Sequence, residues 1–481
     1  MNRRRPGEPV IRSRSAVPGR VSRHYLTGDK QSVSLPGTDR VTGGIVLIPV
    51  VRDVSVCLFG SAILLACTAS FGDSDMSGMN SPDAGSPPPD SNQSPVIDLP
   101  FVPSNILAEH VVAGQARLDL SNPDGVIEID TDTGAILSNG SDVRPQGVAF
   151  VKVAQTGKAG LPDLGVFSAT DLVITSGTRV HVRGAAGLVL ALSGSASIEG
   201  VLFAGGGFDN APGPGGFRGG TGDDVDGAGP GGGKYGGLND TGGGGGGHAA
   251  VGGNGGSRGN APDGVDPGGP GGAVYGGPEL VPLMGGSGGG RGGNTGGAGG
   301  GGGGAIQITA LGSIQIAAGI IDVGGGGGRT SNDDDGGGGG GAGGAILLEA
   351  PTVQLAAGVL VANGGGGGSG GNDRQPGNSG EAGRADITAA AGGARAGEGA
   401  AGGNGGAGEN LAGRPGQNSA GQENVDENAG GGGGACGRIY FRADVLQLAS
   451  PVLSPGEVKN GGLQYPDDSV IRILESRSRQ E

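Results

Sequence analysis

Four apolar blocks, separated by glycine-rich segments, dominate the pattern of hydrophobic and polar positions along the chain. They span residues 188–204, 305–323, 345–363 and 438–453. Inside each block apolar and polar residues alternate over short stretches, which is typical of half-buried strands and not of helices. Each block therefore predicts about three short strands. The predicted inward positions of the two clearest blocks are Ile306, Ile308, Ile314, Ile316, Ile320 and Val323, and Ile346, Leu348, Val353, Leu355, Val359 and Val361.

Three short strands cannot enclose a hydrophobic core alone, so the blocks are expected to stack. The predicted fold class is all-β, a right-handed parallel β-helix (solenoid) with long glycine-rich loops. In such a stack equivalent residues lie about 4.8 Å apart, as they do in any sheet. Ile306 is then expected beside Ile346, and Ile316 beside Leu355.

The glycine-rich inserts occupy residues 205–304, 324–344 and 364–434, each after the third predicted strand of a block. They should leave the stack along one edge. Extended glycine helices with three residues per turn could hydrogen-bond sideways into a bundle. Disorder is the alternative, because glycine loses the most backbone entropy on ordering. The mixed segment 208–233 is expected to be mobile.

Before the blocks, two short strands flank a turn rich in Asp and Gly. Residues 126–129 and 135–137 are β-like, and Asp130, Asp132 and Gly134 lie between them. This pattern predicts a hairpin. The spacing also matches the start of a calcium loop, but the later glutamate of an EF-hand is missing.

An apolar run from residue 54 to 66 ends at Cys67. It is shorter than the ~20 residues that span a bilayer, and it has the length of a signal-peptide core. Leu64-Leu65-Ala66-Cys67 resembles the lipobox of bacterial lipoproteins, in which the signal is cut before a cysteine that is then acylated. The resemblance makes Cys67 the predicted lipidation site. Cys57 fits poorly, because Val54 and Val56 precede it.

The expected organisation has five parts. Residues 1–67 are an N-terminal extension with the lipoprotein signal, and 68–95 are a disordered Ser/Pro/Asp tether. A β-rich region (96–170), the glycine-rich solenoid (171–455) and a C-terminal tail (456–481) follow. Because lipoprotein signals are short, we expect translation to begin near Val50 or Val51. After cleavage before Cys67, Cys436 has no partner for a disulfide.

Composition narrows the function classes. Glycine (119) and proline (29) form roughly a third of the 481 residues, a share typical of low-complexity chains. Unbroken glycine runs exclude collagen, which needs glycine at every third position. The net charge is −15, although residues 1–53 are basic. An acidic remainder argues against nucleic acid as a partner, because binding phosphates needs a basic surface.

The blocks resemble the right-handed parallel β-helix superfamily, and the inserts resemble those of glycine-rich, PGRS-type bacterial surface proteins and lipoproteins. The resemblance covers about residues 172–453. It implies a surface protein with a solenoid body, and it names no ligand.

Several motifs match catalytic or metal-binding signatures through composition alone. G-x-S-x-G at 285–289 lacks a strand-turn-helix context. Residues 231–235 fail as a phosphate loop, since Tyr235 stands where Ser or Thr is needed. Residues 219–226 begin like a calcium nonapeptide, but Asp226 occupies the hydrophobic position. Asp333, Asp334 and Asp335 could contribute to a weak calcium site.

No catalytic constellation emerges from the histidines or the strand faces. His24, His110, His181 and His248 are scattered, and the outward strand positions offer Glu199, Gln307, Gln315, Gln354 and Arg442 without a carboxylate pair for acid/base catalysis. We therefore expect no enzyme, no catalytic residue, no cofactor and no bound metal.

The sequence predicts an exported, lipid-anchored structural or adhesive protein of the cell envelope, at the outer membrane or cell surface. Its expected partners are the membrane, through the anchor, and further copies of itself or surface glycans. Two alternatives remain open: a polysaccharide-active or polysaccharide-binding β-helix protein, and a calcium-dependent adhesin.

Overall fold

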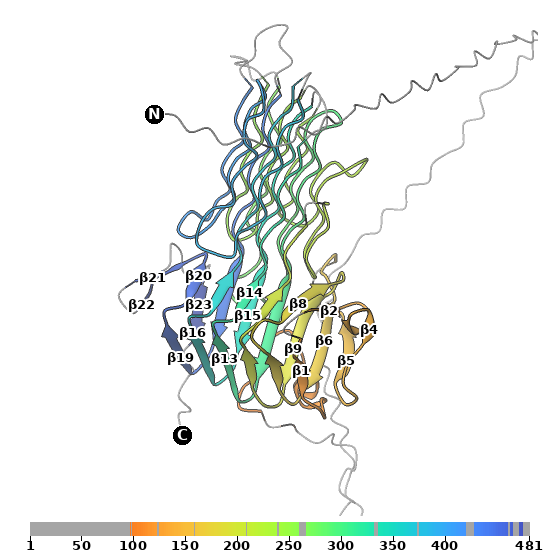
Figure 1. Ribbon diagram of the computed structural model, residues 1–481, viewed down its shortest axis with the longest axis vertical. Coiled ribbons are helices and arrows are strands. Elements are labelled where there is room, and N and C mark those ends of the chain that lie inside the picture. Colours follow the sequence, from red (N-terminus) through yellow and green to blue (C-terminus); the bar gives the residue numbers. More distant parts are fainter. Residues whose placement is uncertain are drawn as a thin grey trace, which may run out of the picture. The chain divides into compact units, whose positions relative to one another are not determined.

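The computed structural model describes residues 97–474, apart from gaps at 98, 123–124, 158, 208, 238–239, 259–265, 331–334, 373–374, 420–427, 460–461 and 465–470. Cys67, Asp333 and Asp334 lie outside these described residues. Figure 1 shows two kinds of structure in them: a region of strands, and long glycine-rich segments that run side by side beyond the strands.

Each apolar block forms three strands, and a further set of three precedes the first block. The sets in chain order are β6 (Leu164–Ala169), β7 (Leu172–Ile174) and β8 (Arg179–Arg183); β9 (Gly187–Leu192), β10 (Ala196–Ile198) and β11 (Val201–Phe203); β12 (Ala305–Ala310), β13 (Ser313–Ala317) and β14 (Ile320–Asp322); β15 (Ala345–Glu349), β16 (Thr352–Ala356) and β17 (Val359–Val361); β18 (Arg438–Arg442), β19 (Val445–Ala449) and β20 (Val452–Ser454).

Every set contributes one strand to each of three sheets. The first sheet has the order β1 (Leu118–Leu120)-β7-β10-β13-β16-β19 and is parallel throughout. The second is β20-β17-β14-β11-β8-β2-β3-β4, where β2 (Val126–Asp130), β3 (Ile136–Ser138) and β4 (Ser141–Asp142) pair antiparallel with one another. The third is β23 (Ile471–Leu474)-β18-β15-β12-β9-β6-β5, with β5 (Ala149–Val153) antiparallel. A hairpin of β21 (Glu457–Lys459) and β22 (Gly462–Gln464) and the helix α1 (Ala108–Val112) complete the described elements.

The predicted register is confirmed. Ile306 pairs with Ile346 on β12 and β15, and Ile316 pairs with Leu355 on β13 and β16. These four side chains are almost fully buried and belong to one hydrophobic cluster that the three sheets share. The alternation of apolar residues therefore determines the register, since a one-residue slip would turn every one of them outward.

The corners between strands explain why the motif Ala-Ala-Gly recurs in the blocks. Ala318 and Ala357 have positive φ angles of 54° and 52° and turn the chain between the second and third strands. The next residue must then pass close to the neighbouring set. A Cβ on Gly319 would lie 2.4 Å from the carbonyl oxygen of Ile198, so only glycine fits there.

The predicted fold class, a right-handed parallel β-helix with long glycine-rich loops, is wrong. The described strands form three mostly parallel sheets of the kind found in α/β proteins, with little helix, and they do not form a recognisable solenoid. The physical reason lies between the blocks. After β11, β14 and β17 the chain leaves the sheets for long excursions that pack on one another, so only the first two sets, β6–β8 and β9–β11, follow each other directly.

The predicted hairpin is confirmed, with Ile129 opposite Ile136 on the antiparallel strands β2 and β3. The carboxylate of Asp130 accepts the backbone N–H groups of Asp132 and Thr133 at 2.9 and 3.0 Å, which closes the turn. Asp132 accepts hydrogen bonds from Lys152 and from the N–H of Ala185. The carboxylates of Asp130 and Asp132, which a calcium loop would use as ligands, are therefore both hydrogen-bonded to groups of the protein.

Candidate functional site

The glycine-rich segments, called here the glycine bundle (described residues of 205–304, 324–344 and 364–437), form the largest feature outside the sheets. Each segment follows the third strand of one set and returns to the first strand of the next, so all of them leave at the same corner, as expected. Their backbones are joined sideways by hydrogen bonds between segments far apart in sequence. The sequence left open whether these segments form a bundle or are disordered, and the described residues form a bundle.

Residues 242–247 show how the bundle is built. Their N–H groups donate in rotation to three neighbours: Gly242 and Gly245 to segment 253–256, Gly243 and Gly246 to 337–340, and Gly244 and Gly247 to 231–234. All six N···O distances lie between 2.8 and 2.9 Å. A partner that recurs at every third residue is the signature of an extended helix with three residues per turn.

The carbonyl groups of the same segment face three further neighbours. Gly269 and Gly272 donate to Gly242 and Gly245, Gly432 and Ala435 donate to Gly243 and Gly246, and Gly290 donates to Gly244. Segment 242–247 is therefore surrounded by six others. Because its six N–H groups and five of its six C=O groups are hydrogen-bonded, the buried backbone of this segment is almost fully satisfied without forming a sheet.

Glycine is required because these backbones approach too closely for a side chain. A Cβ on Gly242 would lie 1.9 Å from the carbonyl oxygen of Gly430, and one on Gly245 would lie 1.9 Å from that of Gly433. Segment 336–341 is enclosed in the same way, with a Cβ on Gly339 placed 2.0 Å from the oxygen of Gly244. No side chain can be accommodated at such distances without moving backbone.

The number of glycines per three-residue turn follows the position of a segment in the bundle. Enclosed segments such as 242–247 and 336–341 have glycine at every position. Segments 252–256 and 268–272 have two glycines per turn, and their third residues, Asn254 and Pro270, are exposed. The number of glycines per turn in a segment thus indicates how many of its sides pack against a neighbouring segment.

Asparagine and proline close the outer sides of the bundle. Asn254 Oδ1 accepts the N–H of Gly271 at 2.8 Å, and Asn418 Oδ1 accepts the N–H of Ser257 at 2.9 Å. Pro267 and Pro270 occupy the donor positions of their segment that meet no neighbour, and proline has no N–H. The outer backbone donors described here are thereby removed or satisfied.

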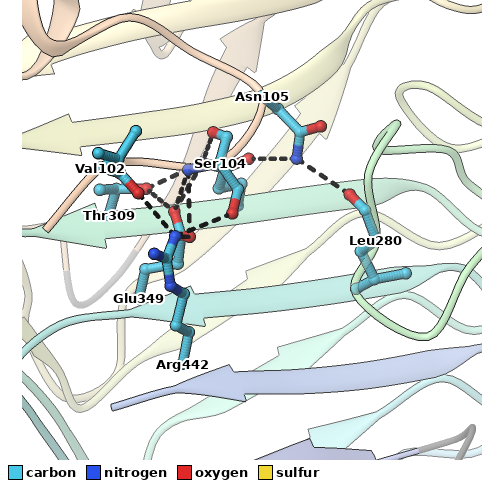
Figure 2. A network of polar contacts seen from close by, with 8 residues as sticks. Val102, Ser104, Asn105, Leu280, Thr309, Glu349 and Arg442 are labelled. Carbon is cyan, nitrogen blue, oxygen red and sulfur yellow. Dashed lines mark hydrogen bonds and ion pairs between the residues drawn. The ribbon is translucent and has the colours of Figure 1, made fainter. Parts of the chain in front are cut away.

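A polar network, called here the N-terminal clip (Ser104, Asn105, Gln307, Thr309, Glu349 and Arg442), lies on the outer side of the third sheet (Figure 2). Register places Thr309, Glu349 and Arg442 in one row across β12, β15 and β18. Glu349 is fully buried. The row is covered by the chain segment that contains Ser104 and Asn105.

The Glu349 carboxylate accepts four kinds of donor. They are the N–H of Ser104 (3.2 Å), Thr309 Oγ1 (2.8 Å), Gln307 Nε2 (3.1 Å) and Arg442 Nη1 (3.2 Å). Arg442 also donates to the carbonyl oxygen of Val102 at 2.6 Å. A buried charge is tolerated only when it is paired and hydrogen-bonded, as it is here. With its oxygens hydrogen-bonded and shielded from water, Glu349 holds the N-terminal segment in place.

Apolar contacts reinforce the clip. Ile106 and Val111 from the N-terminal segment, and Leu280 and Leu283 from the bundle, pack in a second cluster against Tyr440 and its neighbours on the outer side of the third sheet. Asn105 Nδ2 donates to both Gln307 Oε1 and the carbonyl oxygen of Leu280, each at 3.0 Å (Figure 2). The N-terminal segment is thereby joined to both the sheet and the bundle.

His248 lies where the bundle meets the third sheet. It is 1% exposed, and its Nδ1 is 2.8 Å from the carbonyl oxygen of Gly343. Its ring stacks on Tyr275 with 4.8 Å between the ring centroids. Burial, together with the positive charge of Arg438, lowers the pKa of His248 to about 4, although hydrogen bonds to the backbone of Gly343 and Gly344 oppose this shift. In the sequence His248 lies in a glycine-rich loop, and no neighbouring residue in the chain indicates this buried environment.

The other residues singled out from the sequence are dispersed. Gln307 and Arg442 meet in the N-terminal clip, whereas Gln315 and Gln354 pair in register in the first sheet and Glu199 is exposed. Ser287 is buried in the bundle, where its Oγ accepts the N–H of Gly231. Asp226 accepts hydrogen bonds from Lys234 and from the N–H of Tyr235.

Within the described residues no group of three or more His, Cys, Asp or Glu side chains is arranged to hold a metal ion. In the same part of the chain no helix has the length and apolarity to cross a bilayer. Comparison of the chain with protein-family models, with curated proteins and with solved structures finds no match. The fold and the site thus define a body of three mostly parallel sheets, with little helix, that carries a glycine bundle.

Proposed function

We propose that the protein is an exported structural or adhesive protein without catalytic activity, anchored to the cell envelope by lipid on Cys67. The observation that carries the proposal is the glycine bundle. Its segments are enclosed by one another, their backbones hydrogen-bond mainly to one another, and the enclosed glycine positions have no room for a side chain. Such a body is suited to rigidity and spacing.

The N-terminal clip supports the same function. An anchored protein transmits any pull on its tether through the N-terminal end of its folded body. Here that end is held by a buried carboxylate, an arginine and apolar contacts. Residues 68–95 would act as the spacer between the anchor and this clip.

The test is growth of the producing bacterium with labelled palmitate, followed by membrane fractionation and protease treatment of intact cells. Label on the wild type, its loss in Cys67→Ala and its retention in the matched control Cys57→Ala are expected. Protease should remove the body from outside the cell. Label that persists in Cys67→Ala, or a wild-type protein found unlabelled in the cytoplasm, would overturn the proposal.

A further inference from the structure

A pocket of about 500 Å³ opens beside the junction of the glycine bundle and the third sheet. Its walls come from residues 156–157 and 159–161, from the turn at Pro230 and from segment 275–284. The lining is mostly apolar and includes Leu161, Pro230, Tyr275, Val281, Pro282 and Met284. An apolar pocket of this size with few polar groups has the character of a small-molecule site.

His248, which is 1% exposed, lies beside this pocket, and within the described residues its Nε2 atom makes no hydrogen bond. A Cβ on Gly276 would lie 3.9 Å from His248 Nε2 and 3.9 Å from Met284 Cε. Gly276 and Met284 both line the pocket, as does Tyr275, on which the imidazole stacks. Because Gly276 has no side chain, nothing from that residue separates Nε2 from the pocket wall.

The hydrogen bond at the other nitrogen fixes the role of Nε2. Nδ1 faces a carbonyl oxygen, that of Gly343, so Nδ1 carries the proton and donates. Nε2 of the neutral ring is then an acceptor. Burial and the nearby positive charge of Arg438 both favour the neutral form of the imidazole. The face of the Tyr275 ring stacks on the imidazole. An acceptor left buried without a partner is costly, so a ligand that donates to it gains the bond.

We propose that this pocket binds a small neutral molecule with an apolar or aromatic body and one hydroxyl or N–H group, which donates to His248 Nε2. The apolar walls take the body of the ligand, and the single acceptor orients it. A carboxylate has no proton to donate, and a cation meets the charge of Arg438 behind the wall. This inference does not depend on the lipid anchor.

The experiment compares phenol with benzene, which has the same ring and no donor, as probes of the full-length protein. Binding is followed by NMR titration, with the ¹⁵N resonance of His248 Nε2 as the local readout. We expect phenol to bind about tenfold more tightly than benzene and to shift the Nε2 resonance. This comparison needs no variant.

Two variants sharpen the test. His248→Phe keeps a ring to stack on Tyr275 but removes the acceptor, and should abolish the preference for phenol. His181→Phe makes the same change on β8, beside Phe203 and away from the pocket, and should keep the preference. Equal binding of phenol and benzene by the wild type, no binding of either, or an unchanged preference in His248→Phe would each overturn the proposal.

Discussion

At the scale of single residues, the missing Cβ of glycine decides whether the bundle can form. Gly339 and Gly431 are enclosed positions, where a Cβ would lie 2.0 Å from the oxygen of Gly244 and 2.1 Å from that of Gly338. Gly207, by contrast, has its nearest obstacle 3.6 Å away. The enclosed glycines, Gly339 and Gly431, thus differ from Gly207 in how close a neighbouring backbone comes.

Gly339→Ala and Gly431→Ala are expected to lower the free energy of unfolding by about 2 to 3 kcal/mol each, because backbone must move apart to admit the methyl group. Gly207→Ala is the control, and it should change stability by less than about 1 kcal/mol. Denaturant unfolding of the purified variants measures both. Equal effects at the enclosed and open positions would show that close packing is not the reason for glycine.

A second prediction at this scale concerns Asp322, at the end of β14. The residue is 8% exposed, and its carboxylate accepts the N–H of Gly324 at 2.8 Å. Burial raises the pKa of Asp322 to about 6, above its ordinary 3.8. The folded state therefore favours the protonated form, and this contribution to stability is complete below pH 3.8 and is lost as the pH rises through about 6.

Asp322→Asn should remove that pH dependence. We expect its stability relative to the wild type to increase between about pH 4 and 6, by on the order of 3 kcal/mol in total. His248, whose pKa is lowered, acts in the opposite direction, since its contribution is present above pH 6.5 and is lost towards pH 4. Both proteins keep His248, so its effect cancels in the difference. Unfolding curves at several pH values provide the measurement, and a constant difference would contradict the assignment.

At the scale of elements, the N-terminal clip joins a segment of chain to the third sheet through one buried carboxylate. Ser104 and Glu349 are 245 residues apart in sequence, and Arg442 reaches both the segment and the carboxylate. The Arg442 side chain is 32% exposed, so water compensates part of the charge that is left when the Glu349 carboxylate is removed. The cost is therefore smaller than the about 3 to 5 kcal/mol of a fully buried pair.

Glu349→Gln is therefore expected to release the segment from the sheet. In hydrogen-exchange measurements the amides of residues 104–106 should lose protection, while those of β12 and β15 keep theirs. Glu199→Gln changes an exposed glutamate in the first block and is the control. If protection at 104–106 survives in Glu349→Gln, the clip does not hold the segment.

The outer segments of the bundle give a further prediction. Replacing Pro267 and Pro270 by glycine restores two outward N–H groups and removes the side chains that keep another backbone away. Exposed backbone of this kind invites pairing between molecules, as it does at sheet edges. We expect Pro267→Gly with Pro270→Gly to self-associate with increasing concentration, as measured by analytical ultracentrifugation.

Pro267→Ala with Pro270→Ala is the matched control, because alanine restores the N–H group but keeps a Cβ that prevents close approach. This variant should sediment like the wild type. Association of both variants to the same extent would mean that the missing donor alone keeps the molecules apart, and association of neither would mean that these prolines have no such role.

At the scale of the whole described body, the sheets and the bundle depend on each other. The segments enter and leave the bundle at the corner where β11, β14 and β17 end, and the hydrogen-bond pattern continues across that corner, for example from the N–H of Gly344 to the carbonyl oxygen of Val323. The stacked strands place the segments at sheet spacing. The bundle in turn holds the sets of strands together across the long excursions between them.

Part of this arrangement could be predicted from the amino-acid sequence alone. Alternation predicted the strands, the pairing of Ile306 with Ile346 and the hairpin at Asp130, because each depends on neighbours close in sequence or on an internal repeat. Glu349 was missed, although aligning the blocks would have placed it between Thr309 and Arg442. His248 left no signal, because its surroundings come from four distant segments.

The sequence by itself determined which stretches are strands, how repeated strands align and where a side chain is excluded, since these follow from local periodicity and from the lack of a Cβ. Only the tertiary structure decided that the strands form three sheets interrupted by a bundle, which six segments surround 242–247, and that Glu349 and His248 are buried. The reason is physical. Backbone hydrogen bonds between glycines are chemically identical, so the sequence alone does not specify which segments pair.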